Sequence, residues 1–211
     1  MRGKQKQSLI LGLGRFGSSL AKNLCKLGHE VLAVDRDENL VDDIAPYVTQ
    51  AVQADATDEA ALEALGVRNF DAAIVAIGNV RDSILISVLC KEAGVPCVIA
   101  KAVDELHAKV LRKVGVDRVV YPERDMGLRV AKSLVSPNFL EMIELNSEYA
   151  LVELVCPSTW LNRTLVDANI RRNWGVSEEF LVSPGADMKL LAGDVLLILG
   201  KQSDIDKINE K

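Results

Sequence analysis

The chain has 211 residues, of which 49% are apolar and 26% are charged, as in an ordinary globular protein with one large domain and room for a small second one. A net charge of −5 argues against nucleic acid as the main partner, because phosphate binding needs a basic surface. The apolar runs are far too short to span a bilayer, and no secretory leader is evident after Met1. The four cysteines form no CxxC pair, so we interpret them as reduced residues of a cytosolic protein.

Residues 8–122 alternate between short apolar segments and amphipathic ones. The predicted strands are 8–11, 30–35, 50–54, 72–76, 97–101 and 118–121. They are rich in Val, Ile and Ala without alternation, which is typical of strands buried on both faces of a parallel sheet. Helices are predicted at 17–27, 37–46, 58–66, 80–93 and 104–114, and four of them end at a glycine suited to a left-handed cap: Gly28, Gly66, Gly94 and Gly115. The repetition predicts an α/β fold with a Rossmann-like parallel sheet.

The pattern changes after Pro122. A longer helix is expected at 123–134, and the turn-forming residues 136–138 follow it. Residues 139–145 are apolar again, strands are predicted at 150–156 and 194–199, and a short helix is predicted near 165–172. A tail of about 60 residues is too small to bury a large core alone. We therefore expect this part to dimerise or to pack against the first domain.

The segment 12–17 reads Gly-Leu-Gly-Arg-Phe-Gly, directly between the first predicted strand and the first predicted helix. This spacing is the phosphate-binding turn of a nucleotide-binding βαβ unit. Gly12 permits the tight turn, Gly14 lets the backbone approach a pyrophosphate, and Gly17 lets the helix pack closely on the strand. The N–H groups at the helix start and the helix dipole then face the anion.

Asp35 lies 18 residues beyond Gly17, at the end of the second strand. A carboxylate at this place accepts hydrogen bonds from the ribose hydroxyls and disfavours NADP, whose 2′-phosphate it repels. The alternative is that Asp35 is a helix N-cap, because a helix is predicted next to it. Arg36 is a candidate for stacking on adenine, and its alternative is a solvated surface residue.

Two further segments follow predicted strands and should meet at the same carboxyl edge of the sheet. Asp55, Ala56 and Thr57 are candidates for binding adenine, or else an N-cap for the next helix. The fourth strand ends in Ala76, Ile77 and Gly78. Small residues there would let a ligand lie across the end of the strand, and the alternative interpretation is a plain turn.

Arg15 adds a positive charge inside the glycine turn, and such a charge favours a ligand with extra phosphate, such as a nucleoside di- or triphosphate. Its alternative is a solvated loop arginine. Glu123, after the last strand of the sheet, is a candidate ligand for a metal or for the phosphate side. Its alternative is an acidic residue in a helix first turn, which the helix dipole favours in any case.

The sequence offers no catalytic set. Neither His29 nor His107 has an obvious carboxylate or nucleophile partner in a motif, and the Tyr-x-x-x-Lys, GxxxxGK, GxSxG and HExxH patterns are missing. The second domain is also too small for the substrate domain of a typical dehydrogenase. A binding site without catalytic groups indicates a sensor, not an enzyme.

The motifs together resemble the RCK (KTN) domain family, which regulates potassium channels and transporters. The resemblance is carried by the glycine turn at 12–17, GHEVLAVD at 28–35, DAT at 55–57, VAIG at 75–78, KA at 101–102 and VVYPERDMG at 119–127. It extends over essentially the whole chain and is strongest for the cytosolic gating subunits of Ktr/Trk-type potassium uptake systems.

The resemblance implies an N-terminal RCK domain at 5–122, a crossover helix at 123–137 and a small α+β C-terminal RCK domain at 138–211. It implies a cytoplasmic homo-oligomer, in which dimers form a ring of eight subunits beneath a membrane-embedded potassium transporter. The implied ligands are ATP and ADP, with NAD(H) as the alternative. By matching position, phosphate would be held by Gly12, Gly14, Arg15, Phe16 and Gly17. Asp35 and Arg36 would hold the ribose, Asp55, Ala56 and Thr57 the adenine, and Lys101 and Glu123 would lie near the terminal phosphates and a divalent cation.

One part of the chain departs from the family. After Gly175-Val176 the family continues with an apolar strand and a turn, whereas here Ser177 is followed directly by Glu178 and Glu179. The C-terminal domain is therefore expected to be shortened after Ser177. Some relatives bind cyclic di-AMP in this region, and Ile170 and Arg171 match that pattern while its continuation is missing. An NAD-dependent oxidoreductase stays open as the alternative function, because the glycine turn and Asp35 suit that class as well.

Overall fold

The structure is a computed structural model that describes residues 6–135, 139–146, 148–164, 167, 187–201 and 203–205. The chain forms two compact units, Met1–Arg124 and Asp125–Lys211. The helix predicted near 165–172, apart from Asp167, and the apparent gap after Ser177 lie outside the described residues. No helix within the described ranges is long and apolar enough to cross a membrane.

The first unit is a six-stranded parallel sheet with the order β3-β2-β1-β4-β5-β6. The strands are β1 (Gln7–Leu11), β2 (Glu30–Asp35), β3 (Gln50–Gln53), β4 (Ala72–Val75), β5 (Val98–Lys101) and β6 (Arg118–Val120). The helices are α1 (Arg15–Lys26), α2 (Glu38–Ile44), α3 (Glu59–Ala64), α4 (Val80–Glu92) and α5 (Glu105–Val114), with 3-10 turns at Ala45–Tyr47 and Val67–Asn69. The Rossmann-like sheet and its boundaries are confirmed to within about two residues.

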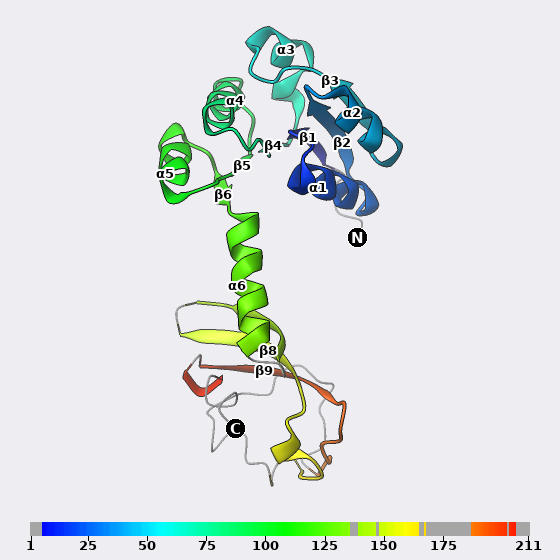
Figure 1. Ribbon diagram of the computed structural model, residues 1–211, viewed down its shortest axis with the longest axis vertical. Coiled ribbons are helices and arrows are strands. Elements are labelled where there is room, and N and C mark those ends of the chain that lie inside the picture. Colours follow the sequence, from blue (N-terminus) through cyan, green and yellow to red (C-terminus); the bar gives the residue numbers. More distant parts are fainter. Residues whose placement is uncertain are drawn as a thin grey trace. The chain divides into compact units, whose positions relative to one another are not determined.

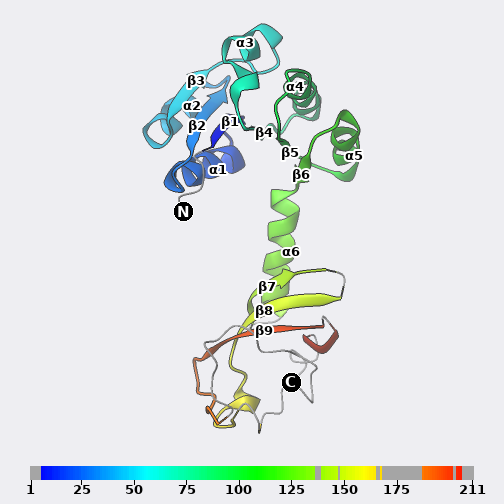
Figure 2. The same cartoon turned by 180° about the vertical axis from the view of Figure 1, so that it is seen from behind.

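Successive residues of β1 explain how both faces of the sheet are covered. Leu9 and Leu11 belong to the core beneath α3, α4 and α5, whereas Ile10 belongs to the core beneath α1 and α2. In both views α4 and α5 lie together on the β4–β6 side, and α1 and α2 lie on the β1–β3 side (Figure 1, Figure 2). The strand order places β1 next to β4, so the chain adds strands in opposite directions on either side of this pair, and folds of this class bind ligands at such a point.

Two strands differ from the expectation that every strand is buried on both faces. Both residues at the ends of β3, Gln50 and Gln53, are exposed, and no residue of β6 is fully buried. The reason is their place in the sheet, because β3 and β6 are its two edges. The four glycines expected to end helices all have positive φ, between 70° and 95°.

The helix α6 (Pro122–Val135) follows β6, and its first residue is the proline that the first turn of a helix tolerates. Large apolar side chains on it are exposed: Met126, Leu128, Val130 and Leu134, by 49–78%. Three of them, Met126, Val130 and Leu134, recur every fourth residue and so share one face of the helix.

The second unit contains an antiparallel sheet with the order β7-β8-β9, made of β7 (Phe139–Glu144), β8 (Tyr149–Val155) and β9 (Val195–Lys201). Alternate residues of β8 are buried: Ala150, Val152 and Leu154. They join Trp160, from the 3-10 turn Ser158–Trp160, in a small core. The two strands predicted in this region are confirmed, and β7 is the strand formed by the apolar run 139–145.

Candidate functional site

The glycine turn connects β1 to α1, and two of its glycines are required by backbone geometry. Gly12 has φ +100°, and a Cβ there would lie 2.8 Å from Cδ1 of Ile77. A Cβ on Gly17 would collide with the carbonyl oxygen of Gly12. Gly14 differs, because a Cβ there would meet no atom within 4 Å. The space beside Gly14 is therefore open to a ligand, as the sequence predicts for the glycine that approaches a pyrophosphate.

The start of α1 lacks the side-chain cap that α2, α3, α4 and α5 have. The helices α2, α3, α4 and α5 each have an N-cap side chain that accepts a hydrogen bond from a backbone N–H of the first turn. These N-cap residues are Asp37, Asp58, Asn79 and Asp104. In the described part of the chain no side chain caps α1, whose N-cap is Gly14, and its first turn contains no acidic residue. Backbone donors and a positive helix end therefore face the open space beside Gly14.

A cavity of about 270 Å³ lies at the carboxyl ends of β1, β2, β3 and β4. Ten residues singled out from the sequence line it: Gly12, Gly14, Asp35, Arg36, Asp55, Ala56, Thr57, Ala76, Ile77 and Gly78. These residues come from four separate turns, so the strand order has brought the predicted segments into one place. Five other predicted residues do not line it: Arg15, Phe16, Gly17, Lys101 and Glu123.

Asp35 at the end of β2 is not a helix cap, because the N-cap of α2 is Asp37. One carboxylate oxygen of Asp35 accepts the Leu13 N–H at 2.6 Å, and the other accepts the Asp37 N–H at 3.0 Å. The glycine turn and the start of α2 thus fix this carboxylate at the wall of the cavity. Arg36 beside it is exposed and also lines the cavity.

Asp55 is not a cap either, because α3 is capped by Asp58. Its Oδ1 accepts the Thr57 N–H at 2.9 Å and the Thr57 hydroxyl at 2.7 Å. These hydrogen bonds hold the pKa of Asp55 below its ordinary value, although burial acts to raise it. The positive charge of Arg36 also lowers the pKa of Asp55. Asp55 is therefore a carboxylate that orders the turn after β3.

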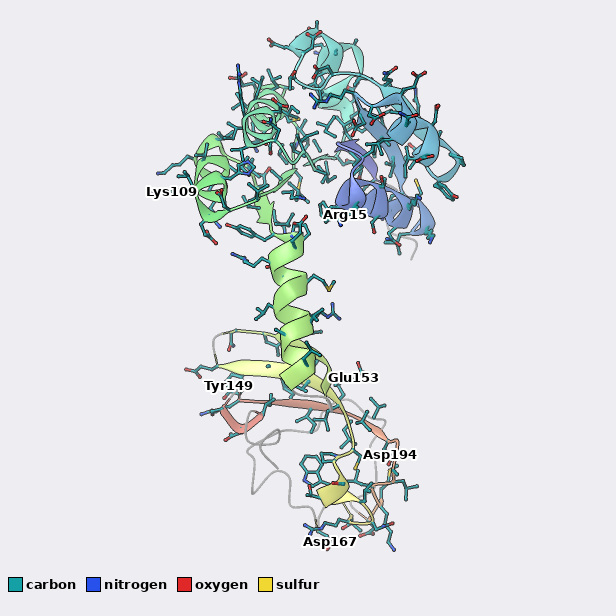
Figure 3. The ribbon with its side chains drawn as sticks, in the orientation of Figure 1. Arg15, Lys109, Tyr149, Glu153, Asp167 and Asp194 are labelled. Carbon is teal, nitrogen blue, oxygen red and sulfur yellow. The ribbon has the colours of Figure 1, made fainter. Side chains whose placement is uncertain are left out.

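A second group of charges lies beside the glycine turn. The Lys101 ammonium and the Glu123 carboxylate form an ion pair at 2.7 Å between the end of β5 and the first turn of α6. The hydrogen bond from Lys101 is the main reason why the pKa of Glu123 is lowered, and the charge of Arg15 adds to the effect. Arg15, at the start of α1, is exposed (Figure 3). The Glu123 carboxylate is thus influenced by both Lys101 and Arg15.

Phe16 packs against the core beneath α1 and α2, so its side chain supports the helix and does not face the cavity. Within the described ranges no group of three or more His, Cys, Asp and Glu side chains is placed to hold a metal ion. Glu123 has Lys101 as its partner and is the residue that the sequence singled out for a cation.

The sequence reasoning missed several residues that line the cavity. They are Val34 of β2, Leu40 of α2, Ala54 after β3, and Asn79, Asp82 and Ile86 of the β4–α4 region. One signal was available for two of them, because Asp82 and Ile86 are four residues apart and share one face of α4. Helix periodicity could not show that this face of α4 lines the same cavity as the glycine turn, because that depends on the position of β4 beside β1.

Comparison with known proteins assigns both parts of the chain. Residues 8–122 match the TrkA-N domain and residues 150–211 match the TrkA-C domain. The Ktr system potassium uptake protein C of Bacillus subtilis (strain 168) is 42% identical over 215 residues, which cover 98% of this chain and 97% of that protein. The Ktr system potassium uptake protein A of the same organism is 41% identical, covering 99% of this chain and 97% of that protein. The first of these alignments is longer than the 211 residues of the chain, so the relative has residues that this chain lacks.

Solved structures agree with the fold. The GsuK channel superposes with a TM-score of 0.71 at 18% identity, covering 98% of this chain and 39% of that chain. The GsuK channel bound to NAD superposes with a TM-score of 0.67 at 19% identity, over 96% of this chain and 38% of that one. GsuK bound to ADP superposes with a TM-score of 0.53 at 19% identity, covering 65% of this chain and 36% of that chain. The domain matches and the Bacillus relatives together show that the chain belongs to the family of Ktr system potassium uptake proteins, with a TrkA-N and a TrkA-C domain.

Proposed function

We propose that the chain senses an adenine nucleotide and thereby gates a membrane potassium transporter. The observation that carries the proposal is the cavity beside the uncapped start of α1, with the Asp35 carboxylate fixed at its wall. A pyrophosphate needs the backbone donors and the helix end, and a ribose needs the carboxylate. Structures of the related fold are described as bound to NAD and to ADP, which supports a nucleotide as the ligand.

ATP and ADP are the proposed physiological pair, with NAD(H) as the alternative. Arg15 is exposed at the start of α1, and Lys101, whose side chain is only 16% exposed, lies close enough to Glu123 to form an ion pair. A terminal phosphate would compete with the Glu123 carboxylate for these two cations, whereas AMP is too short to do so. The number of phosphates would then decide how Glu123 and the first turn of α6 are held, with a divalent cation as a further partner for the released carboxylate.

Gating follows if the two nucleotides bind two conformations of the assembly with different affinities. We propose that the chain pairs into dimers and that these form a cytoplasmic ring, of eight subunits in the family pattern, beneath the transporter. The exposed apolar residues Met126, Val130 and Leu134 on one face of α6 support contacts with another copy. Cyclic di-AMP in the C-terminal domain is a second proposed ligand, for which the described residues offer no test.

The proposal is tested by calorimetric titration of the full-length chain with ATP, ADP, AMP and NADH. Gly14→Val should abolish binding of all four, because its side chain would occupy the space that the phosphates need. The fold should survive, since Gly14 has φ −62° and ψ −175°, which valine adopts readily, and no atom lies within 4 Å of the new Cβ. Gly127→Ala, at another open glycine and outside the cavity, is the control.

Nucleotide binding that survives Gly14→Val unchanged would place the ligand elsewhere and contradict the proposal. The oxidoreductase alternative makes a different prediction, since it requires oxidation of NADH by some small substrate. As a sensor, the chain should bind nucleotide without turnover of either the phosphates or the nicotinamide.

A further inference from the structure

Asp82 forms part of the cavity wall, although it lies far along the chain from the glycine turn. It lies in the first turn of α4, where it is half-buried, and Ile86, one turn later on the same face, is 1% exposed. Both residues line the cavity. Leu40 of α2 and the turn after β3 line the same cavity. The side of the cavity formed by α4 thus combines one carboxylate with an apolar surface.

Three carboxylates line the cavity, and two of them have partners that explain them. Asp35 accepts hydrogen bonds from two backbone N–H groups, and Oδ1 of Asp55 accepts two from Thr57. For the carboxylate of Asp82 there is no hydrogen bond or ion pair with any residue that the structure describes; its backbone N–H donates to the Asn79 side chain that caps α4. A half-buried carboxylate facing a cavity without a partner is suited to accept a hydrogen bond from a ligand.

The chemistry of a nucleotide limits what that donor can be. A phosphate would be repelled by Asp82, and its place is the uncapped start of α1. The ribose hydroxyls belong with Asp35, at the end of β2. The remaining donor is an amino group on the base, and the apolar side chains of Leu40, Ile77 and Ile86 suit the flat faces of a purine.

We propose that Asp82 determines the base specificity of the cavity by accepting a hydrogen bond from the exocyclic amino group of a 6-amino purine. A 6-oxo purine would place a carbonyl oxygen against the same carboxylate and be rejected. This inference rests on the proposed function, because it assumes that the cavity holds a purine nucleotide. It assigns to Asp82 the contact that the sequence suggested for Asp55, which remains the competing acceptor through Oδ2 because Thr57 uses only its Oδ1.

The test compares the binding of ATP and ITP, which differ only in their purine base, to the full-length chain and its variants. The unmodified protein should bind ATP about ten- to a hundredfold more tightly than ITP, the range expected for one hydrogen bond to a charged group. Asp82→Asn keeps the shape but offers an amide N–H₂, so it should weaken ATP, strengthen ITP and reduce or invert the preference. Asp82→Ala should weaken ATP without improving ITP.

Asp42→Asn is the matched control, since it removes the same charge from an exposed residue of α2 that does not line the cavity, and it should leave the ratio unchanged. Asp55→Asn tests the competing assignment, in which Asp55 and not Asp82 accepts the hydrogen bond from the base. The inference is overturned if ATP binds but the ATP/ITP ratio is the same in Asp82→Asn, or if Asp55→Asn shifts the ratio in its place. If neither triphosphate binds the unmodified protein, the proposed function itself fails.

Discussion

Arg15 is the residue on which the proposed distinction between nucleotides depends. It lies outside the cavity lining, is exposed, and is close enough to lower the pKa of Glu123 together with Lys101. A hydrogen bond from the charged Arg15 side chain to a terminal phosphate would contribute about 1.5–3 kcal/mol to binding. Arg15 should therefore matter for the terminal phosphates and little for the nucleoside.

The corresponding prediction is that Arg15→Ala weakens ATP about ten- to a hundredfold and AMP much less. Lys109→Ala is the control with the same change of charge, because Lys109 is exposed on α5 and points away from Arg15 (Figure 3). Calorimetric titration with both nucleotides measures the effect. Equal losses for ATP and AMP would show that Arg15 acts on the whole site and not on the terminal phosphate.

His107 makes a prediction about stability. It is 2% exposed in α5, its Nδ1 accepts the Val103 N–H at 3.4 Å, and its Nε2 has no partner among the residues that the structure describes. Burial lowers the pKa of His107, and the nearby Asp104 only partly opposes this. The unfolded chain therefore binds a proton at His107 more readily than the folded chain, so stability is fully present above about pH 6.5 and is lost as the pH falls towards the folded pKa.

His107→Leu should remove this part of the pH dependence. Urea unfolding at pH 7 and pH 5, followed by circular dichroism, measures it. The free energy of unfolding should fall less between the two pH values in the variant than in the unmodified protein. An identical fall in both proteins would show that His107 does not titrate on unfolding.

At the scale of elements, two ion pairs on neighbouring residues hold the start of α6 against β5 and α5 of the first unit. Glu123 pairs with Lys101 of β5, and Arg124 pairs with Glu105 of α5 at 2.7 Å. The Arg124 guanidinium also lies 3.6 Å from the ring centre of Tyr121, whose hydroxyl donates to Glu105 at 3.0 Å. The two pairs connect the first turn of α6 with separate elements of the domain.

These contacts are only moderately strong, because the side chains of Arg124 and Glu105 are 58% and 70% exposed. An exposed ion pair contributes between 0 and about 1 kcal/mol, and a cation–π contact at an exposed site about 0.5–1 kcal/mol. Arg124→Ala should therefore lower the free energy of unfolding by about 1 kcal/mol, and Arg124→Lys by less. Urea unfolding followed by circular dichroism measures both, and a loss above about 3 kcal/mol would mean that the contact does more than hold the helix start.

The sequence predicted the elements well where the signal is local. The glycine turn, the caps at Gly28 and Gly115 and the ends of the buried strands follow from residues that are neighbours in the chain. Local patterns did not show that β3 and β6 are edges, because strand order is a property of the whole sheet. The same reason explains why Asp82 was missed, since only the pairing of β4 with β1 brings α4 to the glycine turn.

At the scale of the whole molecule, the sequence indicated the family correctly because many short motifs occur in one order over the whole chain. The ligand and the assembly are not decided by that order. In the proposed function, Arg15, Lys101 and Glu123 would distinguish nucleotides, and the exposed apolar face of α6 would contact another copy. Together they suit a switch in which a bound nucleotide selects between two forms of an assembly.

Small-angle X-ray scattering of the full-length protein, saturated in turn with ATP and with ADP, tests this claim most directly. Two different scattering curves are predicted for the unmodified protein, and one curve under both conditions for Gly14→Val, which should bind neither nucleotide. Calorimetry in the same buffer establishes that the unmodified protein is saturated. Identical curves for the ATP-bound and ADP-bound protein would contradict the claim that the nucleotide controls the conformation of the assembly.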